Sequence, residues 1–236
     1  MTIRVGTSGF SYVEWKGTFY PEKLPQKKML AYYAERFSTV EINATFYRMP
    51  KADMLAGWLP EVPAGFSFVL KAPQRITHHK RLVEAEDDTR HFVSVARVMG
   101  EKLGPLLFQL PPHLKKDLPR LSAFLDVFEP TTKLVLEAGD PSWFSDDVYE
   151  LLRARGVALC IVDDASPRKA APFVRTAEHG YLRLRRVSYT DDEIAEWARR
   201  ISDAGFVDAW VFFKHEDAGT GPVLAQKLLE ALERSR

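Results

Sequence analysis

Residues 40–50 read VEINATFYRMP, and the first four of them alternate between apolar and polar side chains. Val40 and Ile42 suit the buried face of a strand. Glu41 and Asn43 place a carboxylate and an amide on the other face, where an unpaired buried charge would be costly. Such a strand is expected where charged side chains find partners, a ligand or water, and the open end of a β-barrel is such a place.

Seven further apolar or β-branched runs resemble this strand and alternate with helical patterns. Together the expected strands cover residues 3–7, 39–43, 66–71, 105–110, 133–138, 157–164, 181–185 and 208–216. Apolar residues at spacings of three and four predict helices over residues 27–37, 89–103, 118–128, 145–156 and 190–202. The helical patterns of segments 51–60 and 165–175 are weak.

Strands that alternate with helices in this way predict an α/β protein built as a single (β/α)8 TIM-type barrel, with an open doubly wound sheet as the alternative. The chain has 236 residues. Because such a barrel needs roughly 250 residues, one domain over residues 1–236 is expected. The net charge of +1 disfavours a protein that is held to nucleic acid by its overall field.

Some classes of protein and site are disfavoured by what the sequence lacks. No secretion signal precedes the first strand and no apolar run is long enough to span a membrane, so a cytoplasmic protein without a membrane partner is expected. Cys160 is the only cysteine, which rules out an internal disulfide and a multi-cysteine metal site. It is expected to be a small buried apolar residue.

The C-terminal ends of the expected strands carry polar residues. Because alternate residues of a barrel strand point inward, period two assigns these polar side chains to the interior: Glu41, Lys71, Gln109, Glu137, Asp163 and Arg183. The last strand adds His215 or, on the opposite parity, Lys214. Barrel enzymes build their active sites at this end. The predicted cluster is therefore either a ligand site or a network of ion pairs that only closes the barrel.

Loops after the strands add aromatic and basic residues. Tyr47 and Trp143 belong to a set of loop aromatics that could stack on a sugar or a base. The segment KAPQRITHHKRL, residues 71–82, supplies His78 and Arg81 as ligands for a phosphate or carboxylate group. Both sets are expected on the same side of the molecule as the polar strand ends.

Six stretches spread over nearly the whole chain resemble the YecE-like family, also called domain of unknown function 72. They are GTSGFSYVEWKGTFYP, EINATFYRMP, KAPQRITHHKRL, LGPLLFQLPP, the pattern E..DPSW from Glu137 to Trp143, and FFKHEDAGTGP. The resemblance implies a TIM-type barrel and no established reaction, substrate or cofactor. Positions that match the family pattern are Glu41, Asn43, Thr45, Phe46, Tyr47, Lys71, Thr77, His78, Arg81, Gln109 and Glu137.

The chain departs from the family pattern at three places. The first is Gly139, where the family commonly has Arg. The second is Arg185 and Arg186, where a His-Gly pair is common. The third is Lys214 and His215, where an Asn pair is common. These departures weaken the transfer of any family role to the ends of the fifth and seventh strands.

Three functions are compatible with the sequence. The first is an enzyme that binds a phosphate-bearing sugar or nucleic-acid fragment at the barrel mouth and performs phosphoester hydrolysis or sugar-phosphate chemistry with carboxylates as general acid and base. The second is a two-carboxylate glycoside hydrolase. The third is a non-catalytic module that binds nucleic acid or a protein. The ligand is expected to be a small anionic or sugar-containing molecule.

The candidate residues follow from these hypotheses. The candidate catalytic residues are Glu41, His78, Glu137 and Asp163. The candidate substrate-binding residues are Asn43, Tyr47, Lys71, Arg81, Gln109, Trp143, Arg183 and His215. A divalent metal could assist, because oxygen and nitrogen donors are expected on one rim, at Glu41, His78, Glu137, Asp163 and His215.

Overall fold

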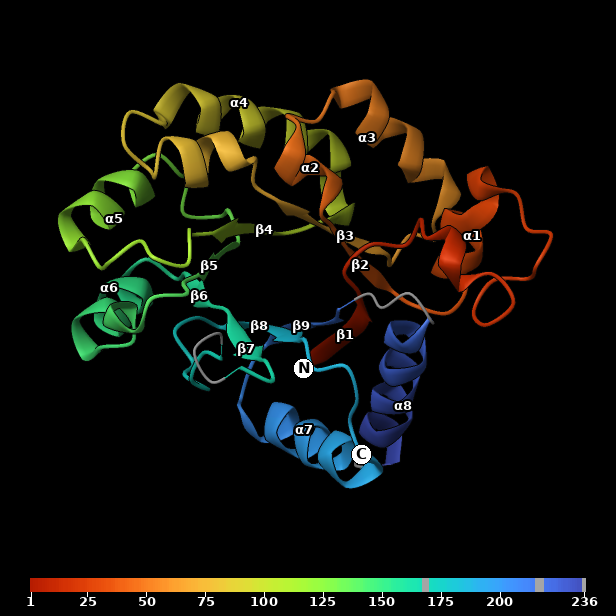
Figure 1. Cartoon of the computed structure of the whole chain (residues 1–236). Coiled ribbons are helices and arrows are strands. Elements are labelled where there is room, and N and C mark those ends of the chain that lie inside the picture. Colours follow the sequence, from red (N-terminus) through yellow and green to blue (C-terminus); the bar gives the residue numbers. More distant parts are fainter. Residues whose placement is uncertain (167–169, 215–218, 235–236) are drawn as a thin grey trace.

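The computed structural model describes residues 1–166, 170–214 and 219–234, and its strands form a ring surrounded by helices (Figure 1). The strands are β1 (Thr2–Thr7), β2 (Thr39–Ile42), β3 (Ser67–Lys71), β4 (Leu103–Gln109), β5 (Leu134–Glu137), β6 (Ala158–Leu159), β7 (Ile161–Asp163), β8 (His179–Leu184) and β9 (Asp208–Phe213). The α-helices are α1 (Met29–Ala34), α2 (Ala44–Tyr47), α3 (Ala52–Trp58), α4 (Glu86–Ala96), α5 (Leu118–Leu125), α6 (Asp146–Ala154), α7 (Asp191–Asp203) and α8 (Thr220–Arg234). None of these helices is long and apolar enough to cross a membrane.

The strands pair in parallel in the orders β1-β9-β8-β7 and β2-β3-β4-β5-β6, and two seams join these sheets into a barrel. At one seam, β6 and β7 are a single strand interrupted at Cys160, whose backbone amide donates to the Leu136 carbonyl at 2.9 Å. At the other, Ser8 and Glu41 form a parallel bridge between the ends of β1 and β2. The fold is therefore a (β/α)8 barrel.

The seam between β1 and β2 depends on a tyrosine and a glycine. The Tyr33 hydroxyl accepts from the Thr7 amide at 2.8 Å and donates to the Thr39 carbonyl at 3.0 Å, so it replaces a direct hydrogen bond between the strands. A Cβ atom at Gly6 would lie 2.2 Å from the Thr39 carbonyl oxygen. Only glycine fits this close approach of the two backbones.

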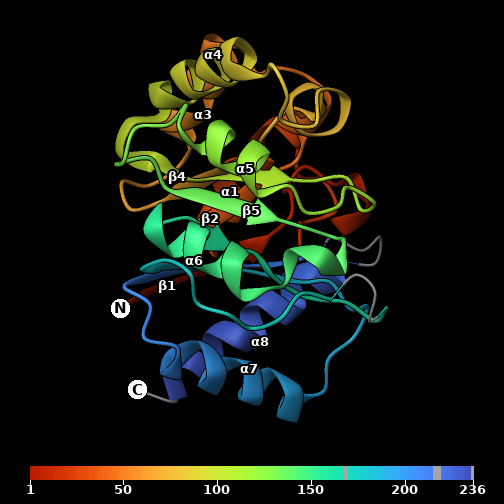
Figure 2. The same ribbon diagram turned by 90° about the vertical axis from the view of Figure 1, so that its left-hand side faces the viewer.

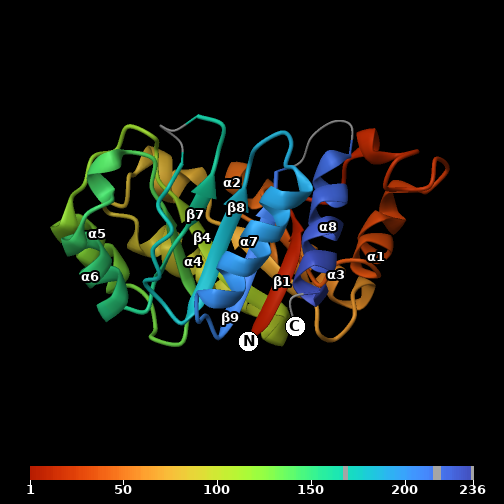
Figure 3. The same ribbon diagram turned by 90° about the horizontal axis from the view of Figure 1, so that it is seen from below.

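Side chains of the strands pack in two layers. Those that point inward include Val69, Leu107, Val135 and Tyr181, and they fill the barrel. Those that point outward pack against the helices. Figure 2 shows the strands between α4 on one side and α7 and α8 on the other. Figure 3 shows α7 and α8 side by side over β1 and β8.

Two helices have side-chain capping interactions at their N-termini. The Asp117 side chain accepts from the Arg120 amide at 3.0 Å at the start of α5. Thr190 and Glu193 form a capping box at the start of α7, in which each side chain accepts from the backbone amide of the other. Caps of this kind typically contribute about 1 kcal/mol each.

The structure confirms the expected strands and the closed barrel, and the open-sheet alternative is wrong. The five expected helices correspond to α1, α4, α5, α6 and α7, and Cys160 is fully buried as expected. Helices α2 and α8 were not expected from the sequence, and α3 falls in a segment with only a weak helical pattern. In segment 165–175 the described residues form no helix or strand. The single domain over residues 1–236 stays a prediction.

Candidate functional site at the barrel mouth

Arg183 of β8 lies between two carboxylates at the C-terminal end of the barrel. Its Nη2 donates to Glu41 Oε1 at 2.8 Å, and its Nη1 donates to Glu137 Oε2 at 2.6 Å. The three side chains are 5%, 0% and 7% exposed. Removing one partner of such a buried pair typically costs about 3–5 kcal/mol. The ends of β2, β5 and β8 are therefore held together by charge.

Further side chains complete the hydrogen bonding of both carboxylates. The Tyr181 hydroxyl donates to Glu41 Oε2 at 2.6 Å. Gln109 Nε2 and Arg185 Nη1 donate to Glu137 Oε1 at 2.7 and 3.2 Å. Each carboxylate oxygen thus accepts at least one hydrogen bond. We call the following residues the mouth cluster: Glu41, Lys71, Gln109, Glu137, Tyr181, Arg183 and Arg185.

Glu137 is held in its ionised form. Burial favours the neutral carboxyl and alone would raise its pKa. The positive charges of Arg183 and Arg185 outweigh burial and lower the pKa of Glu137 to about 2. Glu137 therefore has no proton to donate near neutral pH, and its geometry suits the positioning of arginines better than general acid catalysis.

Lys71, at the end of β3, is buried without an ion-pair partner among the described residues. It is 8% exposed, and within the described part of the chain its Nζ makes no hydrogen bond or ion pair. Nζ lies 4.0 Å from the centre of the Phe46 ring, a distance typical of cation–π contacts. Burial and the nearby charge of Arg183 lower the pKa of Lys71 to about 8. More of this amine is therefore neutral at pH 7 than in an ordinary lysine.

His78 and Asn43 lie next to Lys71 and Glu41 in the mouth. The His78 ring packs edge-on against the same Phe46 ring, with 4.9 Å between ring centres, and burial and the charge of Lys71 lower its pKa. Neutral imidazole is therefore the main form of His78 at pH 7. Asn43 Oδ1 is buried without a hydrogen-bond partner among the described residues, so it is available to a ligand.

Asp163 does not join the mouth cluster, contrary to the prediction. The barrel interior is packed by Ala158, Cys160 and Val162, which places Asp163 on the helix side of the strand. There Asp163 accepts from Arg186 Nε at 2.9 Å. The parity was misjudged because positions 161 and 162 are both apolar, so the sequence did not show which of them faces inward.

Of the other predicted ligand residues, Trp143 lies outside the mouth cluster, whereas Tyr47 and Arg81 are exposed in the segments that follow β2 and β3. Trp143 is fully buried and donates from Nε1 to the Leu114 carbonyl at 2.6 Å, so it is a core residue and not a stacking surface. Tyr47 is 74% exposed, and Arg81 is exposed on the loop after β3, where its φ is 51°. His215 lies outside the described residues.

Three residues that shape the mouth were not assigned to the site from the sequence. Period two points Tyr181 inward with Arg183, and Arg185 continues the same parity just beyond β8, but neither was assigned to the site. Phe46, which lies beneath Lys71, belongs to the EINATFYRMP stretch but was not assigned to the site. Its contact with Lys71 depends on the tertiary fold and has no local signal in the sequence.

The described residues do not assemble the expected metal donors. No group of three or more His, Cys, Asp and Glu side chains that could hold a metal ion occurs among them. Glu41 and Glu137 are ion-paired with Arg183, Asp163 faces the helices, and His215 is outside the described residues. The function proposed below therefore does not depend on a metal.

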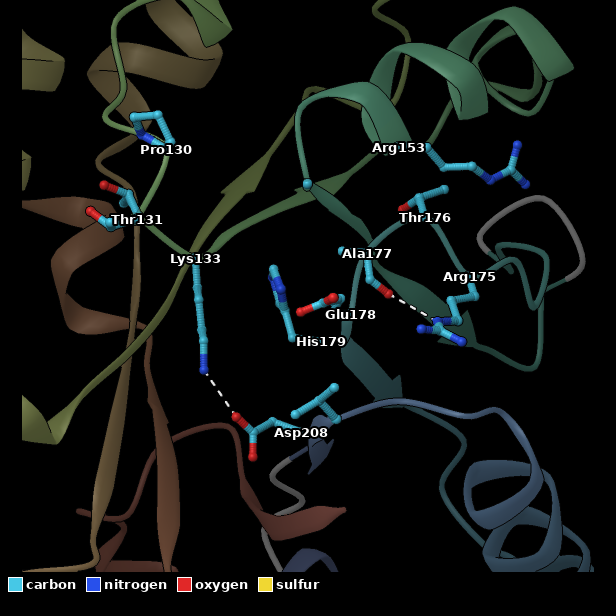
Figure 4. A pocket seen from close by; sticks show the side chains of 13 residues that line it. Pro130, Thr131, Lys133, Arg153, Arg175, Thr176, Ala177, Glu178, His179 and Asp208 are labelled. Atoms are coloured by element: carbon cyan, nitrogen blue, oxygen red, sulfur yellow. Dashed lines mark hydrogen bonds and ion pairs between the residues drawn. The ribbon is translucent and has the colours of Figure 1, made fainter.

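A hollow of about 760 Å³ lies at the opposite, N-terminal end of the barrel (Figure 4). Lys133 Nζ points toward Asp208 across it and donates to Oδ2 at 3.0 Å, and Arg4 lies 3.5 Å from Oδ1. Arg175 Nε donates to the Ala177 carbonyl at 3.2 Å. These charged groups have partners within the protein, and barrel enzymes do not place their chemistry at this end. The mouth is therefore the stronger candidate site.

Comparison with known proteins agrees with this fold. The sequence model described as "Protein of unknown function DUF72" matches residues 4–236. The chain is similar to UPF0759 protein YunF of Bacillus subtilis (strain 168), with 24% identity over 98% of this chain and 95% of YunF. It is also similar to UPF0759 protein YecE of Escherichia coli (strain K12), with 29% identity over 59% of this chain and 54% of YecE.

Solved structures show the same architecture. A DUF72 family protein from Thermotoga maritima MSB8 has a TM-score of 0.87 at 26% identity, covering 99% of this chain and 100% of its own. A DUF72 family protein from Enterococcus faecalis V583 has a TM-score of 0.83 at 19% identity, covering 98% and 96%. SacUVDE has a TM-score of 0.55 at 12% identity, covering 100% and 99%. The last two likenesses concern the fold alone.

Proposed function

The chain belongs to the DUF72 family, and from its mouth cluster we propose that the protein is an enzyme acting on a phosphate-bearing sugar or nucleic-acid fragment. The family description states no activity, so the proposal rests on the chemistry of the site. A shared barrel does not determine a reaction, because many unrelated activities occur on this fold.

The observation that carries the proposal is an excess of positive charge in the mouth cluster, in which Lys71 and Arg183 are buried and Arg185 is 26% exposed. The mouth cluster contains three cations, Lys71, Arg183 and Arg185, against two carboxylates. Within the part of the chain that the structure describes, one positive charge of the cluster is therefore left without a counter-ion. Because an uncompensated buried charge is costly, an anionic ligand that supplies the missing charge would bind favourably.

Unpaired polar groups indicate how such a ligand would be held. Lys71 Nζ is an unpaired donor, and Arg183 Nε is buried without a partner among the described residues. Phosphate oxygens accept hydrogen bonds from such charged donors. Asn43 Oδ1 accepts no hydrogen bond from the described residues and suits a sugar hydroxyl. The mouth cluster and Asn43 together thus offer donors and an acceptor to one small polar molecule.

We propose a different role for the carboxylates from the one that the sequence suggested. Glu41 and Glu137 use their oxygens to hold Arg183, and we propose that they position this arginine. His78 is then the neutral titratable group that is left for proton transfer. A two-carboxylate glycoside hydrolase is less well supported, because it needs one carboxyl group that keeps its proton.

Titration of ligands into the protein tests the proposal. Inorganic phosphate, ribose 5-phosphate and a short oligonucleotide are compared with uncharged ribose by calorimetry, and Lys71→Met is the variant. Phosphate-bearing ligands are expected to bind, with about tenfold weaker affinity in Lys71→Met, since one charge-assisted hydrogen bond is lost. Lys116→Met is the matched control, because Lys116 already pairs with Asp147 at 2.8 Å.

The arms of this titration separate the remaining alternatives. Tighter binding of ribose 5-phosphate supports a sugar phosphate as the ligand. Tighter binding of the oligonucleotide supports a nucleic-acid fragment. Binding of either ligand without any turnover of phosphoester or sugar-phosphate substrates would favour a non-catalytic module. If neither ligand binds at millimolar concentration, the proposal is wrong.

A further inference from the structure

Other lysines of the protein show what is unusual about Lys71. Four of them place Nζ within 3.0 Å of an aspartate carboxylate oxygen: Lys80, Lys116, Lys133 and Lys227. Their side chains are 30% to 46% exposed. Lys71 is more deeply buried and has no such partner within the described part of the chain. Its amine is thus free to react with a ligand that enters the mouth.

We propose that Lys71 is a catalytic residue whose Nζ condenses with the carbonyl carbon of an anionic carbonyl compound, such as a sugar phosphate in its open-chain form, to give an imine. This inference rests on the proposed function, because the same cluster must bind the anionic group. Arg183 and Arg185 lie near the amine and supply the charge for that group. The substrate class therefore combines a carbonyl with a phosphate or carboxylate.

The surroundings of Lys71 favour the reactive form of the amine. Lysines that act as nucleophiles are activated by desolvation or by a neighbouring cation. Both conditions hold here, since Lys71 is 8% exposed and Arg183 is close enough to lower its pKa. With a pKa of about 8, roughly a tenth of the amine is neutral at pH 7. The Phe46 ring packs against the amine, with 4.0 Å between Nζ and the ring centre.

The condensation needs no further reactant. Neutral Nζ attacks the carbonyl carbon, the C–N bond forms as the C=O π bond breaks, and one proton moves from nitrogen to oxygen to give a carbinolamine. Protonation of the hydroxyl releases water, and the nitrogen lone pair forms the C=N bond of an iminium ion. His78 packs on the same Phe46 ring as Lys71 and is placed to carry this proton.

The charge of the cluster is preserved by this step. The iminium ion carries the single positive charge that the ammonium group carried before reaction. Glu137 and Glu41 attract the charge at this position, as they do in the free protein. Ion pairs to Arg183 keep both carboxylates in place throughout. No oxidation or reduction occurs, and one molecule of water is released.

Reductive trapping tests this proposal. The protein is incubated with dihydroxyacetone phosphate and sodium borohydride at pH 8, and adducts are located by intact mass and peptide mapping. One adduct per chain is expected, on Lys71, and it should be absent in Lys71→Met. Lys116→Met should form the adduct as the wild type does. Modification confined to exposed lysines would overturn the proposal.

Lys71→Arg separates the covalent role from the charge. An arginine keeps the positive charge but cannot form an imine, so this variant should bind inorganic phosphate within about threefold of the wild type and form no adduct. A wild-type protein that binds phosphate but gives no Lys71 adduct overturns the imine and leaves the proposed function standing. If phosphate does not bind and neutral dihydroxyacetone labels Lys71 equally fast, the proposed function and the anionic substrate class both fail.

Discussion

The charged side chains at the two ends of the barrel differ in burial and in ion pairing. At the mouth, Arg183, Glu41 and Glu137 are almost fully buried, and the positive charge of Lys71 has no counter-ion among the described residues. At the N-terminal end, Lys133 and Asp208 pair across a hollow of about 760 Å³, with side chains that are 46% and 23% exposed.

This contrast shows that empty volume and binding potential are different properties. Water already solvates the charges around the N-terminal hollow, so a ligand would gain little by replacing it. The mouth cluster is desolvated, so each additional charge or hydrogen bond there has a larger effect. The end with the hollow of about 760 Å³ is therefore the weaker candidate, and the following variants test that conclusion.

The largest effect is expected for Arg183→Met. This change leaves Glu41 and Glu137 buried without their shared cation, and should lower the free energy of unfolding by about 3–5 kcal/mol at pH 7. The loss should shrink at acidic pH, because protonation removes the unpaired charges. Urea-induced unfolding measures both effects. A loss of under about 1 kcal/mol at pH 7 is typical of a surface ion pair and would contradict a costly buried charge at the mouth.

A gain in stability is expected for Lys71→Met. Burial and Arg183 lower the pKa of Lys71 from 10.5 to about 8, so the folded state binds this proton more weakly than the unfolded state does. Wild-type stability should therefore rise as the pH increases from about 8 to 10.5. The variant lacks this penalty and should be more stable by on the order of 1–3 kcal/mol at pH 7.

The pH dependence of this gain distinguishes it from improved packing. The charged and titratable groups that act on Lys71 or pack beside it are Glu41, His78, Glu137, Arg183 and Arg185. Because they are the same in both proteins, the difference between wild type and variant should largely disappear above pH 10.5. Parallel urea titrations at pH 7 and pH 10.5 measure this. A gain that is equal at both pH values would contradict the electrostatic explanation.

Much of the mouth could be predicted from the sequence because strand periodicity is a local property. Lys71, Gln109 and Glu137 each stand two residues after an apolar residue that fills the barrel interior. Parity alone therefore placed them inward, and the structure confirms their convergence with Glu41 and Arg183. Recurring strands and helices likewise predicted the barrel, because each unit repeats the same pattern.

The features of the mouth that could not be predicted from the sequence depend on contacts between distant segments. Asp163 was placed inward because two apolar neighbours left its parity ambiguous. Trp143 was assigned to the site because an aromatic residue in a loop is equally compatible with the core, where the structure places it. Arg183 is the shared partner of two glutamates, whereas Lys71 has no ion-pair partner among the described residues. Both facts follow from distances that no local sequence pattern encodes.

The smallest effect is expected for Lys133→Met at the N-terminal end. Lys133 and Asp208 are partly exposed, and Arg4 remains 3.5 Å from the same carboxylate after the change. The free energy of unfolding should therefore fall by less than about 1 kcal/mol, and phosphate affinity should not change. Urea unfolding and phosphate titration of this variant complete the comparison. A loss as large as that of Arg183→Met, or a loss of phosphate binding, would move the functional site to the hollow.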